Sequence, residues 1–227
     1  MSTPTPPPHT VSETSHSPHA YVPEFGFVSA DPLQSFSYLL GPVEALIGPV
    51  AAGTRVLDIG CGNGAWAEHL LRQGCRVVGI DVSHVGIAHA QKAHPAARFV
   101  KTGIRPDILE VLGEEPFDIV VSTEVIEHLY APREWAACAF DALRPGGRLV
   151  CSTPHHGYLK NLILSITNKW DAHLSPMWDG GHIKFWSRRS LSMLLSEAGF
   201  ENLRFRGAGR APFLWMSMVM SGDKPAR

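Results

Sequence analysis

Short apolar runs alternate with amphipathic segments along most of this chain. The apolar runs match buried strands, and apolar residues spaced three and four apart between them indicate helices. The pattern predicts strands at 55–60, 76–81, 98–101, 117–122, 148–153, 201–207 and 212–220, and helices at 24–52, 63–73, 83–93, 106–113, 131–143 and 188–198. This alternation is typical of an α/β fold with a parallel sheet covered by helices on both faces. A Pro-Gly-Gly break at 144–147 should separate the last of the central helices from its strand.

The segment 155–186 interrupts the alternation after the fifth strand. It is longer than an ordinary connection between elements, which favours a functional lid. Part of it follows a helical period, with apolar residues at Leu159, Leu162, Ile163, Ile166 and Trp170. The lid is either a simple cover over the sheet or a wall for an apolar or aromatic substrate.

Length and composition fit one domain with a full core. The chain has 227 residues, 44% of them hydrophobic, and a formal net charge of −1. Residues 1–22 are rich in Pro, Ser, Thr and His, which predicts a disordered leader before a single domain at 23–227. The sequence lacks an apolar run of about 20 residues and the pattern of a secretion signal. Its four cysteines are scattered, so reduced thiols and a cytoplasmic location are expected.

The charges are unevenly distributed along the chain. Residues 1–150 carry 10 Lys or Arg against 16 Asp or Glu, whereas residues 151–227 carry 10 against 5. The basic last third is either a solvated surface or a surface that meets an anionic substrate or a lipid head group.

Glycines cluster where the first strand should turn into a helix. The stretch DIGCGNG places Asp58, Gly60, Gly62 and Gly64 there, and Asp81 ends the next strand. Glycine lets the backbone bend sharply and approach a ligand, and ligands bind at this edge of an open parallel sheet. The acid before the first glycine and the early third glycine disfavour a pyrophosphate. They favour a cationic cofactor without phosphate, whose ribose Asp81 could bind.

Three stretches, VLDIGCGNG, GID and FDIVVSTEVIEHL, together resemble the class I S-adenosylmethionine-dependent methyltransferases. The resemblance covers about residues 40–220. It implies a Rossmann-like fold, a seven-stranded sheet whose last strand is antiparallel, and S-adenosylmethionine as cofactor. The cofactor residues that it implies are Asp58, Gly60, Cys61, Gly62, Gly64, Asp81, Val82, Thr123 and Glu124. Many members carry an acid after the third strand. This chain has Thr102-Gly103-Ile104 instead, so backbone groups of Gly103 and Ile104 are expected to contact the adenine.

The stretch STEVIEHL, residues 122–129, opens at the end of the fourth strand, where the methyl group of the cofactor should point. If a helix starts there, Glu124, Glu127 and His128 share one face. Two carboxylates this close repel unless something positive lies between them, and a divalent cation would supply it. The alternatives are ordinary residues of a first helical turn, or a metal-free site with His128 as general base.

The full E-x-x-E-H pattern resembles two metal-using groups of O-methyltransferases. One group acts on polyprenylated catechols in ubiquinone biosynthesis, and the other on the terminal 2'-hydroxyl of small RNAs. In both groups a later histidine completes the site. The resemblance therefore implies Glu124, Glu127 and His128 as catalytic residues and metal ligands, with His182 as the fourth ligand. His155 and His156 are the reserve candidates. Such ligands suit Mn, Fe, Co or Zn, and Mg is also a candidate.

The resemblance, together with the apolar lid, implies an S-adenosylmethionine-dependent O-methyltransferase of a catechol-like or polyprenylated aromatic small molecule, assisted by a divalent metal. Lys160, Lys169 and Lys184 lie near the tryptophans of the lid, which fits peripheral contact with a membrane. The alternatives are methylation of a sugar, a natural product or an RNA 2'-hydroxyl, and a non-catalytic cofactor-binding protein. Nucleic acid is not the expected partner, because the chain shows no appended RNA-binding domain and no high overall charge.

Overall fold

Seven strands form one sheet in the computed structural model, which describes residues 27–31, 34–174, 176–177 and 180–226. The strands are β1 (Arg55–Ile59), β2 (Arg76–Asp81), β3 (Arg98–Lys101), β4 (Phe117–Thr123), β5 (Leu143–Pro154), β6 (Glu201–Ala208) and β7 (Ser217–Asp223). They lie in the order β3-β2-β1-β4-β5-β7-β6. Strand β7 runs antiparallel to both of its neighbours, and the other neighbouring pairs of described strands are parallel. The expected seven-stranded, mostly parallel sheet is therefore confirmed, while the expected leader at 1–22 lies outside the described residues.

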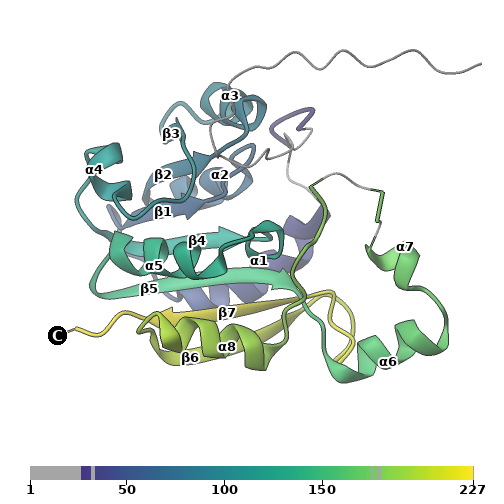
Figure 1. The fold of residues 1–227 in the computed structure, drawn as a ribbon. Coiled ribbons are helices and arrows are strands. Elements are labelled where there is room, and N and C mark those ends of the chain that lie inside the picture. Colours follow the sequence, from purple (N-terminus) through teal and green to yellow (C-terminus); the bar gives the residue numbers. More distant parts are fainter. Residues whose placement is uncertain (1–26, 32–33, 175, 178–179, 227) are drawn as a thin grey trace, which may run out of the picture.

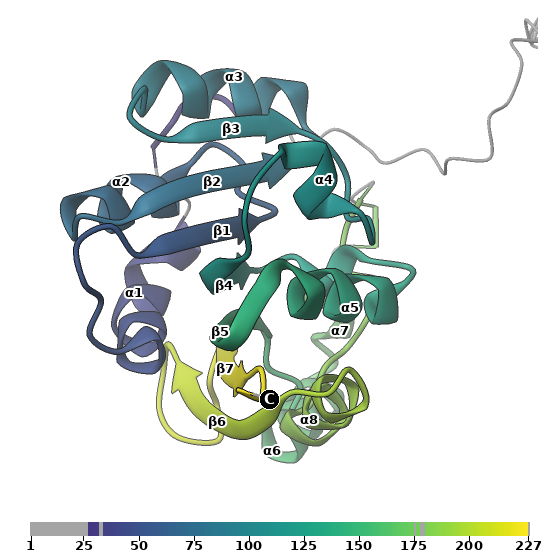
Figure 2. The same ribbon diagram turned by 90° about the vertical axis from the view of Figure 1, so that its left-hand side faces the viewer.

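Helices cover both faces of this sheet (Figure 2). They are α1 (Gln34–Ile47), α2 (Ala65–Arg72), α3 (His84–Ala93), α4 (Ile108–Leu112), α5 (Pro132–Ala142), α6 (Tyr158–Ile166), α7 (Trp170–Leu174), α8 (Arg188–Glu197) and the 3-10 helix η1 (Ile126–His128). The first three helices pack on one face, and α4, α5 and α8 pack on the other. Because both faces are covered, residues 56–59 of β1 are all buried, which explains why three of the four are apolar.

The segment after β5 contains α6 and α7, which lie beyond the carboxyl ends of the central strands (Figure 1). Helix α6 presents an apolar surface to solvent, made by Tyr158, Leu159, Leu162, Ile163 and Ile166. No helix among the described residues is both long enough and apolar enough to cross a membrane.

Three of the predicted boundaries are wrong. The first helix is confined to Gln34–Ile47 within the described residues, because Gly48 follows it with a positive φ of 77°. The last strand starts at Ser217 rather than at 212, because Phe213 has a φ of 67° and the chain turns there. The break at 144–147 is not a turn outside the sheet. Strand β5 already begins at Leu143 and includes these residues. Its register with β4 shifts there, as at a β-bulge.

Candidate active site

The glycine turn between β1 and α2 forms one wall of a large cavity at the carboxyl ends of the strands. Gly60 and Gly62 have positive φ values of 76° and 51°, which other residues rarely adopt. A Cβ atom on Gly60 would lie only 2.3 Å from a methyl carbon of Val125. The cavity measures about 750 Å3, a size typical of small-molecule sites.

Most of the residues predicted to hold the cofactor line this cavity. They are Gly60, Cys61, Gly62, Asp81, Val82, Gly103, Ile104, Thr123 and Glu124. At the end of β2, the carboxylate of Asp81 accepts hydrogen bonds from the backbone N–H groups of Gly62 and Ser83, both at 2.8 Å. Burial raises the pKa of Asp81 even though these hydrogen bonds oppose the shift. The carboxylate is thus fixed beside the turn, as contact with a ribose would require.

Two of the predicted cofactor residues, Asp58 and Gly64, do not line the cavity. Asp58 lies inside β1 with only 1% of its surface exposed, and neither carboxylate oxygen has a hydrogen-bond partner among the described residues. Burial, with repulsion from Asp81, raises the pKa of Asp58 to about 7. Gly64 precedes α2 with a φ of 83°, and a Cβ atom there would lie 2.9 Å from Ala90. Its role is therefore close packing between helices.

Several residues that shape the cavity were not predicted from the sequence. The ring of Phe27 packs so closely on the glycine turn that a Cβ atom on Gly62 would lie 2.6 Å from it. The amide of Asn63 donates hydrogen bonds to the backbone oxygens of Ser29 and Asp31, at 2.9 and 2.8 Å. These contacts tie the segment before α1 to the glycine turn. Asn63 could have been noticed because it lies within the turn, but the sequence around Phe27 carries no comparable signal.

The stretch STEVIEHL does not begin a regular α-helix, so this prediction is wrong. The chain forms only the short 3-10 helix η1, and Glu124 has a φ of 53°, an unusual conformation for a residue other than glycine. The carboxylate of Glu124 accepts hydrogen bonds from the hydroxyls of Ser152 at 2.7 Å and Ser217 at 3.1 Å. Glu124 therefore lines the cavity without joining the metal-type group described next.

Glu127, His128 and His182 do come together, as the family resemblance implied for these three. Each offers one potential ligand atom, and the three atoms lie within 4.8 Å of one another. Glu127 has 1% of its surface exposed, and neither carboxylate oxygen has a hydrogen-bond partner among the described residues. Burial and repulsion from Glu124 raise the pKa of Glu127 well above its ordinary value. The geometry thus places a buried acid without a hydrogen bond beside two imidazoles, with Oε1 of Glu127 4.0 Å from Nε2 of His128.

Backbone contacts explain how residues so far apart in the sequence meet. The backbone oxygen of Glu127 accepts hydrogen bonds from the N–H groups of Ile183 and Lys184, at 2.9 and 3.0 Å. Nδ1 of His128 donates to the carbonyl oxygen of Gly180 at 2.8 Å. A carbonyl oxygen only accepts, so Nδ1 carries the proton of this hydrogen bond, and Nε2 lies 4.0 Å from Oε1 of Glu127.

The reserve candidates His155 and His156 are not part of this group. The ring of His155 packs edge-on against Trp215, with centroids 5.4 Å apart. The ring of His156 lies 5.4 Å from that of His173 and 5.0 Å from that of Phe185. Burial, followed by repulsion from neighbouring cationic groups, lowers the pKa of both His156 and His182 to about 4. Their rings are therefore neutral at pH 7, which is the form in which histidine binds metals.

The fold and the glycine turn define a class I methyltransferase architecture. A solved S-adenosylmethionine-dependent methyltransferase from Archaeoglobus fulgidus superposes on the chain with a TM-score of 0.59 and 17% identity. The superposition covers 82% of this chain and 91% of that one. A family model described as a methyltransferase domain matches residues 34–204. The chain therefore belongs to the methyltransferase domain family, and it is an S-adenosylmethionine-dependent methyltransferase.

Within this family the chain is similar to enzymes named ubiquinone biosynthesis O-methyltransferase. The protein of that name from Ruegeria pomeroyi is 32% identical over 178 residues, which are 76% of this chain and 70% of that protein. The one from Roseobacter denitrificans is also 32% identical, over 177 residues that cover 75% of this chain and 68% of that protein. The family resemblance stated from the motifs is thereby confirmed.

Proposed function

We propose that this methyltransferase methylates a hydroxyl of a catechol-like or polyprenylated aromatic small molecule, with a divalent metal held by Glu127, His128 and His182. The supporting observation is the buried carboxylate of Glu127, which has no hydrogen-bond partner among the described residues and lies beside the imidazoles of His128 and His182. An unpaired acid in such a place is costly, and a bound cation would offset the cost. The names of the similar enzymes support oxygen as the methyl acceptor.

The donor set fits a divalent ion. Ligand atoms about 2.1 Å from a metal lie roughly 3 to 3.5 Å from one another. The three atoms of this group lie within 4.8 Å, so small side-chain rotations would bring them to that separation. One carboxylate and two imidazoles suit Mn, Fe, Co or Zn, with Mg as a further candidate. Glu124, which the sequence also assigned to the metal, is instead held by two serine hydroxyls.

The remaining residues of the cavity bind and orient the two reactants. The glycine turn and Asp81 hold the cofactor, while His128, Leu129, Tyr130 and Ile183 line the end where the acceptor would lie. A phenol titrates near pH 10, so little phenolate exists at pH 7, and a divalent ion supplies the positive charge that favours the phenolate. The protein contributes proximity by keeping the acceptor oxygen in line with the methyl group.

The exposed apolar surface of α6 leads us to propose that the segment 155–186 contacts a lipid surface, where a polyprenylated acceptor would reside. This surface includes Tyr158 and Ile166, and Lys169 follows the helix at an exposed position. An apolar helix face bordered by a cation is typical of interfacial segments. Lys160, which the sequence assigned to the same role, is instead buried and donates to the backbone oxygen of Met216 at 3.3 Å. Burial lowers the pKa of Lys160 to about 8.

The test is methyl transfer from labelled S-adenosylmethionine to a panel of acceptors. The panel contains a polyprenylated catechol, the same compound with the neighbouring hydroxyl blocked, a sugar and an RNA 3' end. Chelation with EDTA and the variant Glu127→Gln should each lower turnover of the catechol at least 100-fold, since loss of groups that merely support a metal ligand already costs 10- to 100-fold. Binding of S-adenosylhomocysteine should be unchanged. The variant Glu134→Gln, on the exposed part of α5, is the matched control.

Each alternative makes a different prediction in the same assay. Turnover that survives both chelation and Glu127→Gln would rule out metal assistance and leave His128 as the candidate base. Preference for the sugar or the RNA end would reassign the acceptor. Tight cofactor binding without turnover of any acceptor would favour a non-catalytic cofactor-binding protein.

A further inference from the structure

A second cavity lies at the opposite end of the sheet from the cofactor site. It measures about 380 Å3, and its lining includes Arg55, Arg76, Arg98 and Glu114. The three arginines are the first residues of β1, β2 and β3, which are neighbours in the sheet. The cavity is therefore at the amino-terminal ends of parallel strands, whereas the methyltransferase site is at their carboxyl ends.

The strand register places all three arginines on one face of the sheet. Arg55 lies directly opposite Arg76 in the pairing of β1 with β2. Arg98 lies opposite Val78, and Val78 is two residues after Arg76 on the same strand. Residues two apart in a strand share a face, so the three side chains leave neighbouring strands on the same face, and all three residues line the cavity. Like charges placed opposite each other in this way are destabilising unless an anion compensates them.

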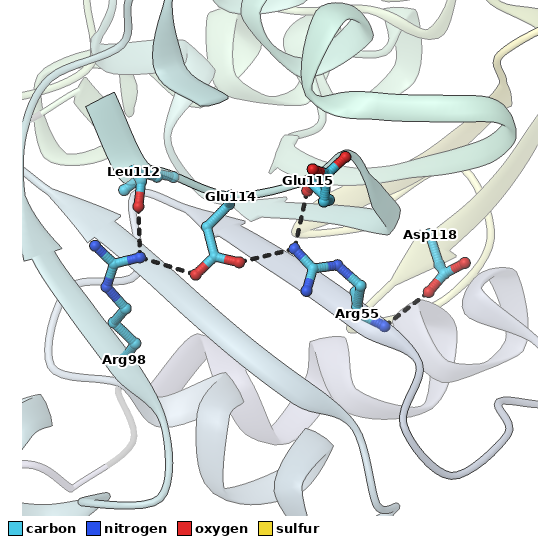
Figure 3. Close-up of polar contacts among 6 residues, drawn as sticks. All are labelled: Arg55, Arg98, Leu112, Glu114, Glu115 and Asp118. Atoms are coloured by element: carbon cyan, nitrogen blue, oxygen red, sulfur yellow. Dashed lines mark hydrogen bonds and ion pairs between the residues drawn. The ribbon is translucent and has the colours of Figure 1, made fainter. Parts of the chain in front are cut away.

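A single carboxylate of the cavity lining compensates part of this charge (Figure 3). Glu114 lies between Arg55 and Arg98, with its two oxygens 2.7 and 2.8 Å from their guanidinium nitrogens. Nearby Asp118 is already engaged, because it accepts hydrogen bonds from the backbone N–H of Arg55 at 2.8 Å and from Arg144 at 2.6 Å. Three cations thus face one carboxylate around the cavity.

Two donors at this site remain unused among the described residues. The buried Nε of Arg55 has no hydrogen-bond acceptor. The side chain of Arg76, on the strand between the other two, has neither an ion pair nor a hydrogen bond in the described part of the chain. Arginine presents its donors in a planar fork that matches the oxygens of a phosphate group.

We propose that the cavity beneath β1, β2 and β3 binds a phosphate group, either as the free ion or as a small phosphate monoester. Two positive charges exceed the charge of Glu114, and a phosphate dianion would balance them. The site is separate from the cofactor cavity, so the anion would bind together with S-adenosylmethionine rather than compete with it. The bound phosphate would stabilise the amino-terminal ends of these three strands, where the three arginines otherwise repel one another.

Calorimetric titration of the full chain with inorganic phosphate tests the proposal, at constant ionic strength maintained with sodium chloride. We expect one phosphate per chain, with binding at least tenfold weaker in Arg76→Ala and partly restored in Arg76→Lys, since a charge-assisted hydrogen bond is worth roughly that factor. Arg72→Ala is the matched control, because Arg72 is exposed nearby and pairs with Glu68 outside the cavity. Binding of S-adenosylhomocysteine should be the same in all four proteins, which also reports that each is folded.

A parallel titration with glycerol 3-phosphate distinguishes the two sources of the ligand. Binding of both compounds with the same dependence on Arg76 supports a site open to monoesters, and binding of inorganic phosphate alone supports a site for the free ion. Absence of saturable phosphate binding by the unmodified chain overturns the proposal. Equal affinity in Arg76→Ala and the unmodified chain overturns it as well.

Discussion

Replacing Asp58 by asparagine should stabilise the protein while weakening its hold on the cofactor. The carboxylate of Asp58 is buried in β1 without a hydrogen-bond partner among the described residues. Its ionisation is opposed by burial and by the charge of Asp81, which together raise the pKa to about 7. Asparagine has almost the same shape but no charge, so the change removes the electrostatic cost.

The size of the effect follows from the pKa. A shift from the ordinary value of 3.8 to about 7 is roughly three units, and each unit corresponds to about 1.4 kcal/mol. Ionised Asp58 therefore costs up to about 4 kcal/mol at pH 8. The new amide is also buried without a partner, which offsets about 1 to 3 kcal/mol. We expect a net gain of about 1 to 3 kcal/mol in the free energy of unfolding.

The sign of the pH dependence is also fixed. Because the folded pKa is raised, the native state favours protonated Asp58, and its stability falls as pH rises from 3.8 through 7. The advantage of Asp58→Asn should therefore be largest at pH 8 and diminish steadily toward pH 4. Urea unfolding of both cofactor-free proteins at several pH values measures this difference in the free energy of unfolding. Asp171→Asn, at an exposed position of α7, is the control.

The functional cost should appear in the same variant. Ionised Asp58 attracts the positive charge of S-adenosylmethionine, so its removal should weaken cofactor binding roughly tenfold, or about 1.4 kcal/mol. Equal stability of the variant and the unmodified protein at pH 8, or a difference that does not change with pH, would refute the argument that Asp58 is held in an unfavourable charge state.

Three further predictions concern the walls of the cavity. In metal-free protein at pH 7, Glu127→Gln should raise the melting temperature by roughly 2–8 °C, because it removes about 1 to 2 kcal/mol of the cost of burying a carboxylate without a hydrogen bond; a lower melting temperature in differential scanning calorimetry would contradict this. Phe27→Ala removes a ring that packs on Gly62 and should weaken binding of S-adenosylhomocysteine roughly tenfold by calorimetry, and unchanged affinity would show that the ring has no part in binding. Ser217→Ala removes one of the two hydroxyls that donate hydrogen bonds to the carboxylate of Glu124. It should lower kcat/KM roughly tenfold, and kinetics equal to those of the unmodified enzyme would speak against a positioning role for this hydroxyl.

The amino-acid sequence alone was sufficient to predict the parallel sheet and a cofactor site at the carboxyl ends of its strands. Buried parallel strands need continuous apolar runs, and runs such as RVLDI and RVVGID have few other stable arrangements. Glycines at positive φ are local requirements of a tight turn, so DIGCGNG located the site without any tertiary information. The starts of β5 and β7 were harder to predict from the sequence, because pairing with distant strands decides where these two strands begin.

Only the tertiary structure decided which of the predicted ligands meet. The spacing of Glu124, Glu127 and His128 suggested one helical face, but the positive φ of Glu124 turns its carboxylate toward serines of β5 and β7. His182 joins the group through backbone hydrogen bonds between the 180–185 segment and η1, which no spacing rule could supply. The sequence determined the local backbone requirements of the fold and its glycine turn. The folded chain decided the contacts between residues remote in sequence, because these depend on how separate elements pack.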